Sequence, residues 1–451
     1  MANISAFLLA GTASGSGKTT ITLGIMAALK ERGLAVQPYK CGPDFIDPTL
    51  HSMVTGEISS NLDLRMCGKE FCENIFAKRL IDKDVGIVEG VMGLFDGGEA
   101  SSASLALALN IPVILVVDAR SAAESVAAVV KGFESFLPGL QLAGVIFNRV
   151  GSTRHKELIV SAMKGNCRSR ILGFFPRDQR FEIPDRHLGL VMGQEKPLQD
   201  DKLKELIAQV EQYIDLDQLL DMGTGKKTPT ATITSPPMPI STKMKIAVAK
   251  DEAFCFYYQD NFDILINYGA ELCFFSPLHD EHLPEGCRGI YLGGGYPELH
   301  GEKLSGNQSI LRELYAFADN DGVIYGECGG FMYLCQTLTD LEGSSHTMSE
   351  IFPLNVRMRP RLSRLGYREV VLEKECCLGK KGQKLYGHEF HYSEIVPGSE
   401  SGSTCYLLNS NAKEGYMQKN VLGSYVHLHF GKNPDTAGYL IEKMAQSPAQ
   451  T

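Results

Sequence analysis

The sequence lacks a cationic excess, a long apolar run and paired cysteines, and each absence argues against a class of protein. Its 44 Lys and Arg are outnumbered by 53 Asp and Glu, which gives a net charge of -9 at pH 7. That balance argues against a nucleic-acid partner. No apolar run approaches the ~20 residues that a membrane-spanning helix needs, so we expect no membrane partner. The 12 cysteines include no C-x-x-C pair, and we expect no structural zinc site.

The N-terminus also lacks the positively charged segment of a secretory signal. Its short apolar run continues directly into a glycine-rich pattern, so we expect a buried first strand there. Scattered cysteines in a chain without a signal are typical of reduced thiols. We therefore expect a cytoplasmic protein.

What the sequence does contain is two successive α/β patterns. Its 451 residues, 44% hydrophobic and 22% charged, suffice for two or three domains with buried cores. In residues 1–222, short apolar strands alternate with longer amphipathic stretches, which predicts a mostly parallel sheet covered by helices. Strands are expected at 4–10, 34–39, 85–89, 113–118 and 143–148, and helices at 19–32, 122–136 and 200–220.

The composition changes abruptly at residues 223–243, where Gly, Thr, Ser, Pro and Lys dominate. Such a stretch predicts a linker. A second α/β pattern follows in residues 244–451, with strands expected at 245–249, 272–275, 289–292, 322–325 and 421–426. The halves share no internal repeat, so we expect two domains that carry different chemistry.

A phosphate-binding pattern, GTASGSGKTT, lies where the first strand meets the first helix. Its glycines allow backbone N–H groups to converge on phosphate oxygens beside a helix N-terminus, where Lys18 would reach the β- and γ-phosphates and Thr19 would bind Mg²⁺. Gly17, the glycine before the lysine, lies six positions after Gly11, one more than in the usual pattern. The alternative is a glycine-rich turn. The candidate nucleotide-binding residues are Gly11, Thr12, Gly15, Ser16, Gly17, Lys18, Thr19 and Thr20.

Polar residues follow two further strands of this sheet, and the carboxyl ends of parallel strands share one edge. The segment KCGPDFIDP contains Lys40, Asp44 and Asp47, and the next strand ends at Glu89 in VEGVMGLFDG. We expect Lys40 to neutralise a transferring phosphoryl group. With Thr19, the three carboxylates are the candidate magnesium ligands. Each acid alone is also compatible with a helix cap or a turn.

The second half contains one cysteine in a distinctive setting. Cys328 lies in YGECGGFMYL, a strand followed by a glycine-flanked turn and an apolar helix. Such an elbow exposes a nucleophile, and the helix N-terminus is expected to lower the thiol pKa. The strand before it ends in LGGGYPE, whose backbone N–H groups could stabilise an oxyanion. The candidate oxyanion-hole residues are Gly294, Gly295 and Gly329.

A general base for this thiol is expected near the end of the chain, in GSYVHLHF. His427 or His429 would accept the thiol proton and donate it to the departing ammonia. His388 and His391, in YGHEFHY, are either structural or line the contact with glutamine or with the other domain.

Taken together, these segments resemble the cobyrinate a,c-diamide synthase family over nearly the whole chain. The motifs that carry the resemblance, in order, are GTASGSGKTT, KCGPDFIDP, VEGVMGLFDG, FPRDQRFEIPDRHLGL, LGGGYPE, GECGGFMYL, SRLGYR, GHEFHYSE and SYVHLHF. The resemblance implies an N-terminal domain like that of dethiobiotin synthetase, which shares the longer phosphate loop, and a C-terminal class I glutaminase domain. It also implies that Asn148 reads the nucleotide base, unless it is a turn residue.

The resemblance further implies a reaction. ATP with Mg²⁺ would phosphorylate the a- and c-acetate carboxylates of cobyrinate, and ammonia released from L-glutamine at Cys328 would form the amides. Related glutaminases carry an acid two residues after the catalytic histidine, and His429 takes that place here. A Cys328–His427 pair is therefore expected, with its third partner open. The candidate cationic residues for binding the corrin carboxylates are Arg177, Arg180, Arg186 and His187, with a solvated loop or a domain-contact surface as the alternative. Asp96 is a further candidate substrate contact.

Several alternatives stay open at this point. The same reaction on Ni-sirohydrochlorin, in the coenzyme F430 pathway, or on hydrogenobyrinate would leave the motifs almost unchanged. Cobyric acid synthase is disfavoured by the PDFIDP pattern. A partner-regulated ATPase switch would need no glutaminase half, and a binding module with an inactive glutaminase would not need the cysteine elbow. A homodimer is compatible with the sequence.

Overall fold

The computed structural model describes residues 4–177, 181, 185–186, 189–190, 200–224, 243–397 and 403–449. The chain divides into two compact units, Met1–Ile233 and Thr234–Thr451. This division falls within the predicted linker at 223–243, most of which lies outside the described residues. The domain bounds 1–222 and 244–451 stay predictions. Each unit is described by itself below.

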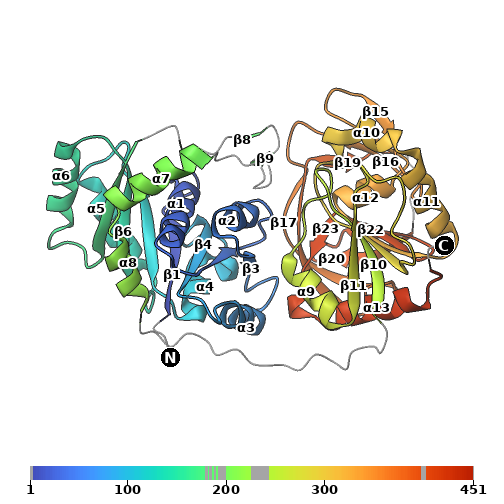
Figure 1. Cartoon of the computed structure of the whole chain (residues 1–451), viewed down its shortest axis with the longest axis horizontal. Coiled ribbons are helices and arrows are strands. Elements are labelled where there is room, and N and C mark those ends of the chain that lie inside the picture. Colours follow the sequence, from blue (N-terminus) through green and yellow to red (C-terminus); the bar gives the residue numbers. More distant parts are fainter. Residues whose placement is uncertain are drawn as a thin grey trace. The chain divides into compact units, whose positions relative to one another are not determined.

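The first unit is built on a parallel sheet with the strand order β3-β2-β4-β1-β5-β6-β7 (Figure 1). The central strand β1 is buried along its whole length, and its neighbours β4 and β5 are buried except near their ends, because helices cover both faces of such a sheet. Phe7, Ile114 and Ile146, from three adjacent strands, belong to the core on one side. The strands are β1 (Ser5–Gly11), β2 (Val36–Cys41), β3 (Ser60–Leu62), β4 (Val85–Gly93), β5 (Val113–Asp118), β6 (Leu142–Val150) and β7 (Arg170–Pro176).

The helices of this unit connect successive strands and leave the carboxyl ends of the strands at one edge. They are α1 (Lys18–Glu31), α2 (Asp47–Thr55), α3 (Lys69–Arg79), α4 (Ser102–Leu109), α5 (Ser125–Phe136), α6 (Thr153–Met163), α7 (Asp200–Tyr213) and α8 (Leu216–Gly223). The single helix expected at 200–220 is wrong, since α7 and α8 are separate. The Asp215 side chain accepts from the backbone N–H of Gln218 at 2.9 Å and so begins a new helix. A short hairpin, β8 (Asp185–Arg186) with β9 (Gly189–Leu190), completes the described part.

The second unit is built on a mixed sheet with the order β11-β10-β12-β13-β22-β21-β20-β17-β18-β23. Its parallel part comprises β10 (Met244–Ala249), β11 (Ala270–Phe275), β12 (Gly289–Leu292), β13 (Val323–Glu327) and β22 (Val421–Ser424). Its antiparallel part adds β17 (Arg364–Leu372), β18 (Lys384–His391), β20 (Ser403–Leu408), β21 (Lys413–Gln418) and β23 (Val426–Leu428). A smaller sheet contains β14 (Thr337–Thr339), β15 (Ser345–Thr347), β16 (Asn355–Met358) and β19 (Ser393–Ile395).

Helices pack around this sheet (Figure 1). They are α9 (Gln259–Asn267), α10 (Gly301–Gly306), α11 (Gln308–Asp319), α12 (Gly329–Leu334) and α13 (Asp435–Gln446). The helix α12 follows β13 after a single residue, Cys328, which therefore lies at the carboxyl edge of the parallel strands.

The strand expected at 421–426 is in fact two strands that pair at different places in the sheet. The backbone N–H of Tyr425 donates to Glu414 Oε1 at 2.7 Å, and that of Val426 donates to Ser424 Oγ at 2.9 Å. Because side chains take these two N–H groups, the ladder of β22 ends at Ser424. The chain then continues as β23 beside β18, which places His427 opposite His388.

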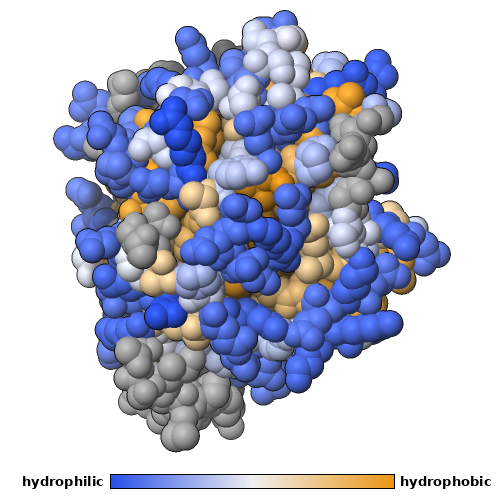
Figure 2. Space-filling view, turned by 90° about the vertical axis from the view of Figure 1, so that its right-hand side faces the viewer, coloured by the Kyte–Doolittle hydropathy of each residue, from blue (hydrophilic) through white to orange (hydrophobic). Residues whose placement is uncertain are grey.

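In the part of the chain that the structure describes, no helix is both long and apolar enough to cross a bilayer. On the face drawn in Figure 2, hydrophilic side chains are interspersed with smaller hydrophobic areas. Such a mixture is ordinary for a protein surface.

Candidate active site

The phosphate loop is held in shape by residues at the end of β6. Gly17 has φ of 85°, and a Cβ at this position would lie 2.1 Å from Asn148 Nδ2, so only glycine fits. Asn148 Nδ2 donates to the carbonyl of Ser16 at 2.9 Å, and Arg149 Nη1 donates to that of Gly15 at 2.8 Å. The Ser16 hydroxyl is buried with no hydrogen-bond partner in the described residues. A phosphate oxygen would satisfy it.

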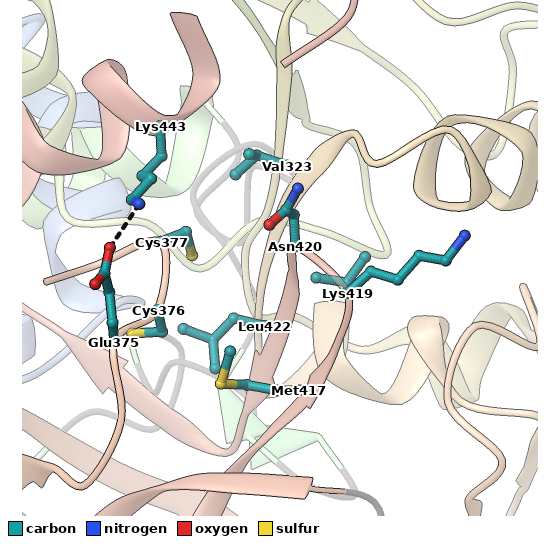
Figure 3. Close-up of a pocket in the computed structure, with 10 residues that line it drawn as sticks. Val323, Glu375, Cys376, Cys377, Met417, Lys419, Asn420, Leu422 and Lys443 are labelled. Carbon is teal, nitrogen blue, oxygen red and sulfur yellow. Dashed lines mark hydrogen bonds and ion pairs between the residues drawn. The ribbon is translucent and has the colours of Figure 1, made fainter. Parts of the chain in front are cut away.

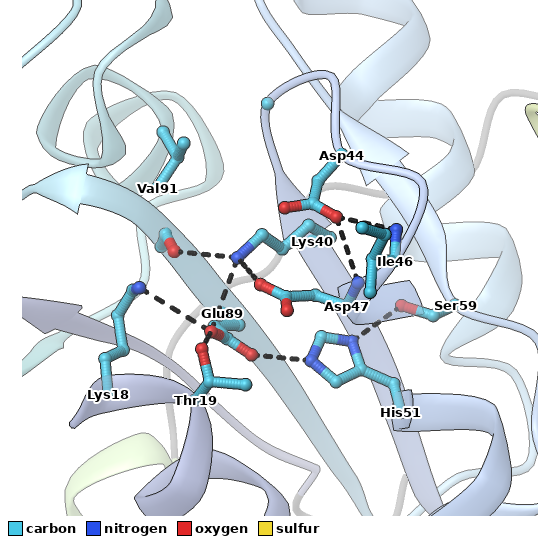
Figure 4. Close-up of polar contacts among 12 residues, drawn as sticks. Lys18, Thr19, Lys40, Asp44, Ile46, Asp47, His51, Ser59, Glu89 and Val91 are labelled. Atoms are coloured by element: carbon cyan, nitrogen blue, oxygen red, sulfur yellow. Dashed lines mark hydrogen bonds and ion pairs between the residues drawn. The ribbon is translucent and has the colours of Figure 1, made fainter. Parts of the chain in front are cut away.

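The two residues that open α1 meet a buried carboxylate from β4 (Figure 4). Thr19 Oγ1 donates to Glu89 Oε1 at 2.7 Å, and Lys18 Nζ lies 3.6 Å from the same oxygen. β1 and β4 are parallel neighbours in the sheet, so the loop after one strand reaches the end of the other. The structure thus brings together the predicted phosphate-binding lysine, the predicted magnesium-binding threonine and the predicted acid.

A second lysine enters this cluster from β2. Lys40 Nζ is ion-paired with Asp47, lies 3.3 Å from Glu89 Oε1 and donates to the carbonyl of Gly90 at 3.2 Å. Its side chain is 2% exposed, so the ammonium group is almost fully removed from water. Figure 4 shows Lys40 and Asp47 converging on Glu89 from the side opposite Lys18.

Burial and charge compete in setting the protonation of this cluster. Burial disfavours the ammonium of Lys40, but Asp47 and Glu89 outweigh it and raise the pKa of Lys40. Burial also disfavours the Glu89 carboxylate, yet Lys40, His51 and Lys18 hold the pKa of Glu89 well below its usual value. Burial and the nearby Asp44 and Glu89 raise the pKa of Asp47 to about 6. The cluster therefore contains two carboxylates with well-separated pKa values.

His51 belongs to this cluster but was missed in the sequence. Its Nε2 lies 2.7 Å from Glu89 Oε2 and its Nδ1 lies 3.0 Å from Ser59 Oγ, with the side chain fully buried. His51 and Asp47 are four positions apart on α2, so they lie on the same helix face. That spacing is the signal that would have identified it.

Other predicted site residues of this unit lie outside the cluster around Glu89 or contact only their own segment of the chain. Asp44 Oδ1 accepts from the backbone N–H groups of Ile46 and Asp47 at 2.8 and 2.9 Å, which is the turn role that the sequence left open. Asp96 Oδ2 accepts from the N–H of Gly93 at 2.9 Å in an exposed turn. Arg177 is exposed just after β7, and Arg186 ends β8. Arg180 and His187 lie outside the described residues.

The residues present fit a nucleotide with a magnesium ion. Among the described residues, no group of three or more His, Cys, Asp or Glu side chains could by itself hold a metal ion. Magnesium does not need one, since it commonly binds one or two carboxylates together with phosphate oxygens and water. Thr19, Glu89 and Asp47 supply such a partial set beside the loop. Asp47 Oδ1 is buried and has no hydrogen-bond partner in the described part.

In the second unit, Cys328 sits on a strained turn. Its φ is 47°, which is unfavourable for a residue with a side chain. Its backbone N–H donates to the carbonyl of Ser424 at 2.7 Å, and the N–H of Gly330 donates to that of Gly293 at 2.9 Å. A Cβ at Gly330 would lie 2.2 Å from the carbonyl oxygen of Leu292. The elbow is thus tied between two neighbouring strands, as the glycine-flanked sequence predicts.

The glycine-rich loop after β12 lies against both the elbow and the candidate base. A Cβ at Gly329 would be 3.0 Å from the backbone N of Gly295, and a Cβ at Gly294 would be 2.3 Å from His427 Cε1. The loop therefore lies between the residue after Cys328 and the imidazole of His427. The role of the glycine N–H groups as an oxyanion hole stays a prediction.

The thiol pKa does not move in the expected direction. Burial raises the pKa of Cys328 above its ordinary value, and the nearby Glu298 carboxylate raises it further. The N–H of Gly329, the first residue of α12, lowers this pKa as expected, but burial and Glu298 outweigh it, since the thiol is 6% exposed. A base is needed to form the thiolate.

His427 is suited to be that base. Burial, together with His388 and His391, lowers the pKa of His427 to about 3, so its imidazole is neutral and able to accept a proton. His429 is used differently: its Nδ1 accepts from the N–H of Gly431 at 2.9 Å and its ring packs on Tyr258. Of the two candidate histidines, His427 is therefore the one beside the elbow.

Comparison with known proteins decides the family. A model described as the CobQ/CobB/MinD/ParA nucleotide binding domain matches residues 7–191, and one described as the CobB/CobQ-like glutamine amidotransferase domain matches residues 245–435. Cobyrinate a,c-diamide synthase from Caldanaerobacter subterraneus subsp. tengcongensis is 42% identical over 432 residues, which cover 94% of each chain. Its Salmonella typhimurium counterpart is 40% identical over 443 residues, covering 95% of this chain and 96% of that one. The chain belongs to the cobyrinate a,c-diamide synthase family.

Membership in the cobyrinate a,c-diamide synthase family confirms two predictions. The fold is a nucleotide-binding parallel-sheet domain followed by a glutamine amidotransferase-like α/β domain. The activity is that of an amide-forming ligase that takes its nitrogen from glutamine.

A pocket of about 250 Å³ in the amidotransferase-like domain of this family member lies away from the elbow (Figure 3). It is lined by Val323 and Val421, the first residues of β13 and β22, and by Cys376, Cys377 and the Glu375–Lys443 ion pair. These strands begin at the sheet edge opposite to Cys328. Cys376 and Cys377, the adjacent pair in the sequence, therefore play no part in the candidate site.

Proposed function

We propose that this chain amidates the a- and c-acetate carboxylates of cobyrinate, using ATP with Mg²⁺ and glutamine, in cobalamin biosynthesis. The observation that carries the proposal is that one chain holds both a phosphate loop facing a buried Lys–Glu cluster and a strained cysteine beside a neutral histidine. The relatives' name, cobyrinate a,c-diamide synthase, supplies the substrate.

In the first unit, the site residues stabilise the negative charge of the phosphates. Lys18 and Lys40 stand on opposite sides of Glu89 and neutralise the negative charge of a phosphoryl group in transfer to a carboxylate. Thr19, Glu89 and Asp47 hold Mg²⁺ against the phosphates. The product is an acyl phosphate, in which the poor leaving group of the acid has become a good one. Arg177, Arg186 and His187 are the proposed cationic contacts of the other corrin carboxylates.

In the second unit, the site residues transfer the proton of the Cys328 thiol. His427 takes the thiol proton of Cys328, and the thiolate attacks the side-chain amide of glutamine. The N–H groups of Gly294, Gly295 and Gly329 stabilise the oxyanion. His427 then donates its proton to the departing ammonia, leaving a glutamyl thioester that water hydrolyses. The ammonia attacks the acyl phosphate and yields the amide.

The test is to separate the two nitrogen sources. Cys328→Ala is expected to abolish amidation with glutamine and to leave amidation with ammonium ions intact, because only glutamine hydrolysis needs the thiol. Cys335→Ala is the matched control, since Cys335 is also a buried thiol at the same helix but donates only to the carbonyl of Phe331. Formation of the amide is measured by mass spectrometry. Loss of both reactions in a folded, ATP-binding C328A protein would refute the division of labour.

The identity of the tetrapyrrole is tested in the same assay. Cobyrinate, hydrogenobyrinate and Ni-sirohydrochlorin are offered separately with ammonium ions, and kcat/KM is compared. Cobyrinate is expected to give the highest value, with two ATP hydrolysed for each diamide. Steady ATP hydrolysis without any tetrapyrrole would instead indicate an ATPase switch.

A further inference from the structure

The third partner of the Cys328–His427 pair was left open by the sequence, because a histidine stands where related glutaminases carry an acid. The structure places another acid close to His427. Glu327, the last residue of β13 and the residue before the nucleophile, has its Oε2 3.9 Å from His427 Nδ1. Both side chains are 2% exposed.

Three hydrogen bonds fix this carboxylate. Tyr325 Oη and Tyr291 Oη donate to it at 2.5 and 3.0 Å, and the backbone N–H of Leu428 donates to it at 3.0 Å. The last of these joins β13 to β23 at the residue after His427. Glu327 therefore sets the position of the strand that carries the base as well as facing its ring.

Two other acids lie in this region. The Glu389 carboxylate also favours the charged form of His427, but its oxygens contact other side chains. Glu389 lies 2.5 Å from Arg368 and 2.9 Å from His391. Glu414 accepts from the Ser424 hydroxyl and the Tyr425 N–H at 2.6 and 2.7 Å. Among the described residues, Glu327 is the carboxylate within ion-pair distance of His427.

We propose that Glu327 is the positioning residue of the glutaminase site: it orients the His427 imidazole and balances its positive charge after proton transfer from Cys328. The inference rests on the proposed roles of Cys328 and His427. In the step itself the S–H bond of Cys328 breaks and an N–H bond forms on His427, while Glu327 keeps its charge and takes no proton. An anion beside the developing imidazolium stabilises it, as in hydrolase triads.

Burial supports this role physically. It raises the pKa of Glu327 to about 7, because no cation in the resting site compensates for lost hydration. An imidazolium at 3.9 Å would supply that compensation. The imidazolium that forms when the thiol loses its proton therefore lies beside the Glu327 carboxylate, which stabilises it.

The test compares four proteins: the wild type, Glu327→Gln, His427→Ala and the double variant. The readout is the rate constant for alkylation of Cys328 by iodoacetamide at fixed pH, followed by mass spectrometry of the labelled peptide. Glu327→Gln is expected to lower this rate and to lower kcat for glutamine hydrolysis by on the order of 10², with KM for glutamine little changed. In the His427→Ala background the same substitution is expected to have no further effect, because Glu327 acts through His427.

A purely structural role predicts a different result, namely the same loss of alkylation rate in both backgrounds. That outcome would overturn the inference, as would wild-type alkylation in Glu327→Gln. Glu134→Gln is the matched control, since Glu134 Oε1 also accepts three hydrogen bonds, from the Arg168 and Ser169 N–H groups and the Ser169 hydroxyl, but lies in the other unit. Amidation with ammonium ions in each variant reports whether the chain is folded.

Failure of the inference can be distinguished from failure of the proposed function. If the function is right and the inference wrong, Cys328→Ala and His427→Ala abolish glutamine hydrolysis while Glu327→Gln does not. If Cys328→Ala retains glutamine hydrolysis, the proposed function itself fails.

Discussion

At the scale of single residues, both candidate sites rest on ionisable groups that water cannot reach. Lys40, Glu89, Glu327 and His427 are each 2% exposed or less. A buried charge is costly unless a partner stands beside it. In the first unit the partners are present and keep Lys40 and Glu89 ionised. In the second unit burial raises the pKa of Glu327 and lowers the pKa of His427, so burial disfavours the charged form of each group.

Replacing Glu89 by Gln is expected to destabilise the protein at neutral pH by about 3–5 kcal/mol, because Lys40 and Lys18 lose their shared buried partner. The pKa of Glu89 is lowered from the ordinary 4.5 on folding, so its contribution is present above pH 4.5 and is lost as the pH falls towards the folded-state pKa. Urea unfolding of both proteins at pH 7 and at pH 4 measures the difference.

The difference in free energy of unfolding should therefore shrink at pH 4. The exposed Glu99 serves as a control, since Glu99→Gln should alter stability at neither pH. Unchanged stability of Glu89→Gln at pH 7 would show that the ion pairs contribute nothing.

At the scale of elements, the sites depend on how strands end. Three parallel strands of the first unit end beside one another, which carries Lys40, Glu89 and the phosphate loop to a common edge. In the second unit, β13 ends in the elbow and the break between β22 and β23 turns His427 towards it. Glycines at these ends let neighbouring backbones approach closely.

Gly17→Ala is expected to weaken ATP binding by about tenfold or more, because a side chain at this φ costs on the order of 1–3 kcal/mol and meets Asn148. Isothermal titration calorimetry with ATP and Mg²⁺ measures the affinity. Gly132→Ala is the control, since Gly132 lies in α5 and a Cβ there meets nothing within 4 Å. Unchanged affinity in Gly17→Ala would mean that this loop does not bind the nucleotide.

At the scale of the whole molecule, the chain consists of two compact units, each with its own sheet and its own chemistry. A unit with its own core can unfold as a separate step. A ligand stabilises only the unit that binds it, by about 2.7 kcal/mol when its concentration is 100 times its Kd.

ATP with Mg²⁺ is therefore expected to raise the Tm of one calorimetric transition and to leave a second one unchanged. Lys18→Ala should remove the shift, because Lys18 is a proposed phosphate contact. A single transition that shifts as a whole would show that the two units unfold together.

Much of both sites could be predicted from the sequence because their motifs are continuous segments. The phosphate loop, KCGPDFIDP, the cysteine elbow and the late histidine each report a local backbone shape, and the structure brings these residues together in two clusters. His51 carried only its helical spacing from Asp47, and Glu327 carried no signal of a role towards His427. Their roles depend on distances to Glu89 and His427, 38 and 100 positions away in the chain.

The pKa of Cys328 also could not be predicted from the local sequence. A turn before a helix suggests a lowered thiol pKa, yet the six residues of α12 cannot offset burial and the Glu298 carboxylate. Local sequence specifies which backbone conformation a segment adopts. Dehydration and the nearest charge are set by segments that are distant in the chain.

By itself, then, the sequence determined the two α/β halves and the family, and it predicted the nucleophile and the phosphate loop, since each follows from residue pattern along the chain. Only the tertiary structure decided which histidine stands beside Cys328, which acid faces that histidine, and how Lys40 is kept charged in the interior. Those outcomes depend on the strand order and on the break between β22 and β23 after Ser424. Strands that are distant in sequence come into contact there, and these contacts determine which charged side chains are buried and which opposite charges lie beside them.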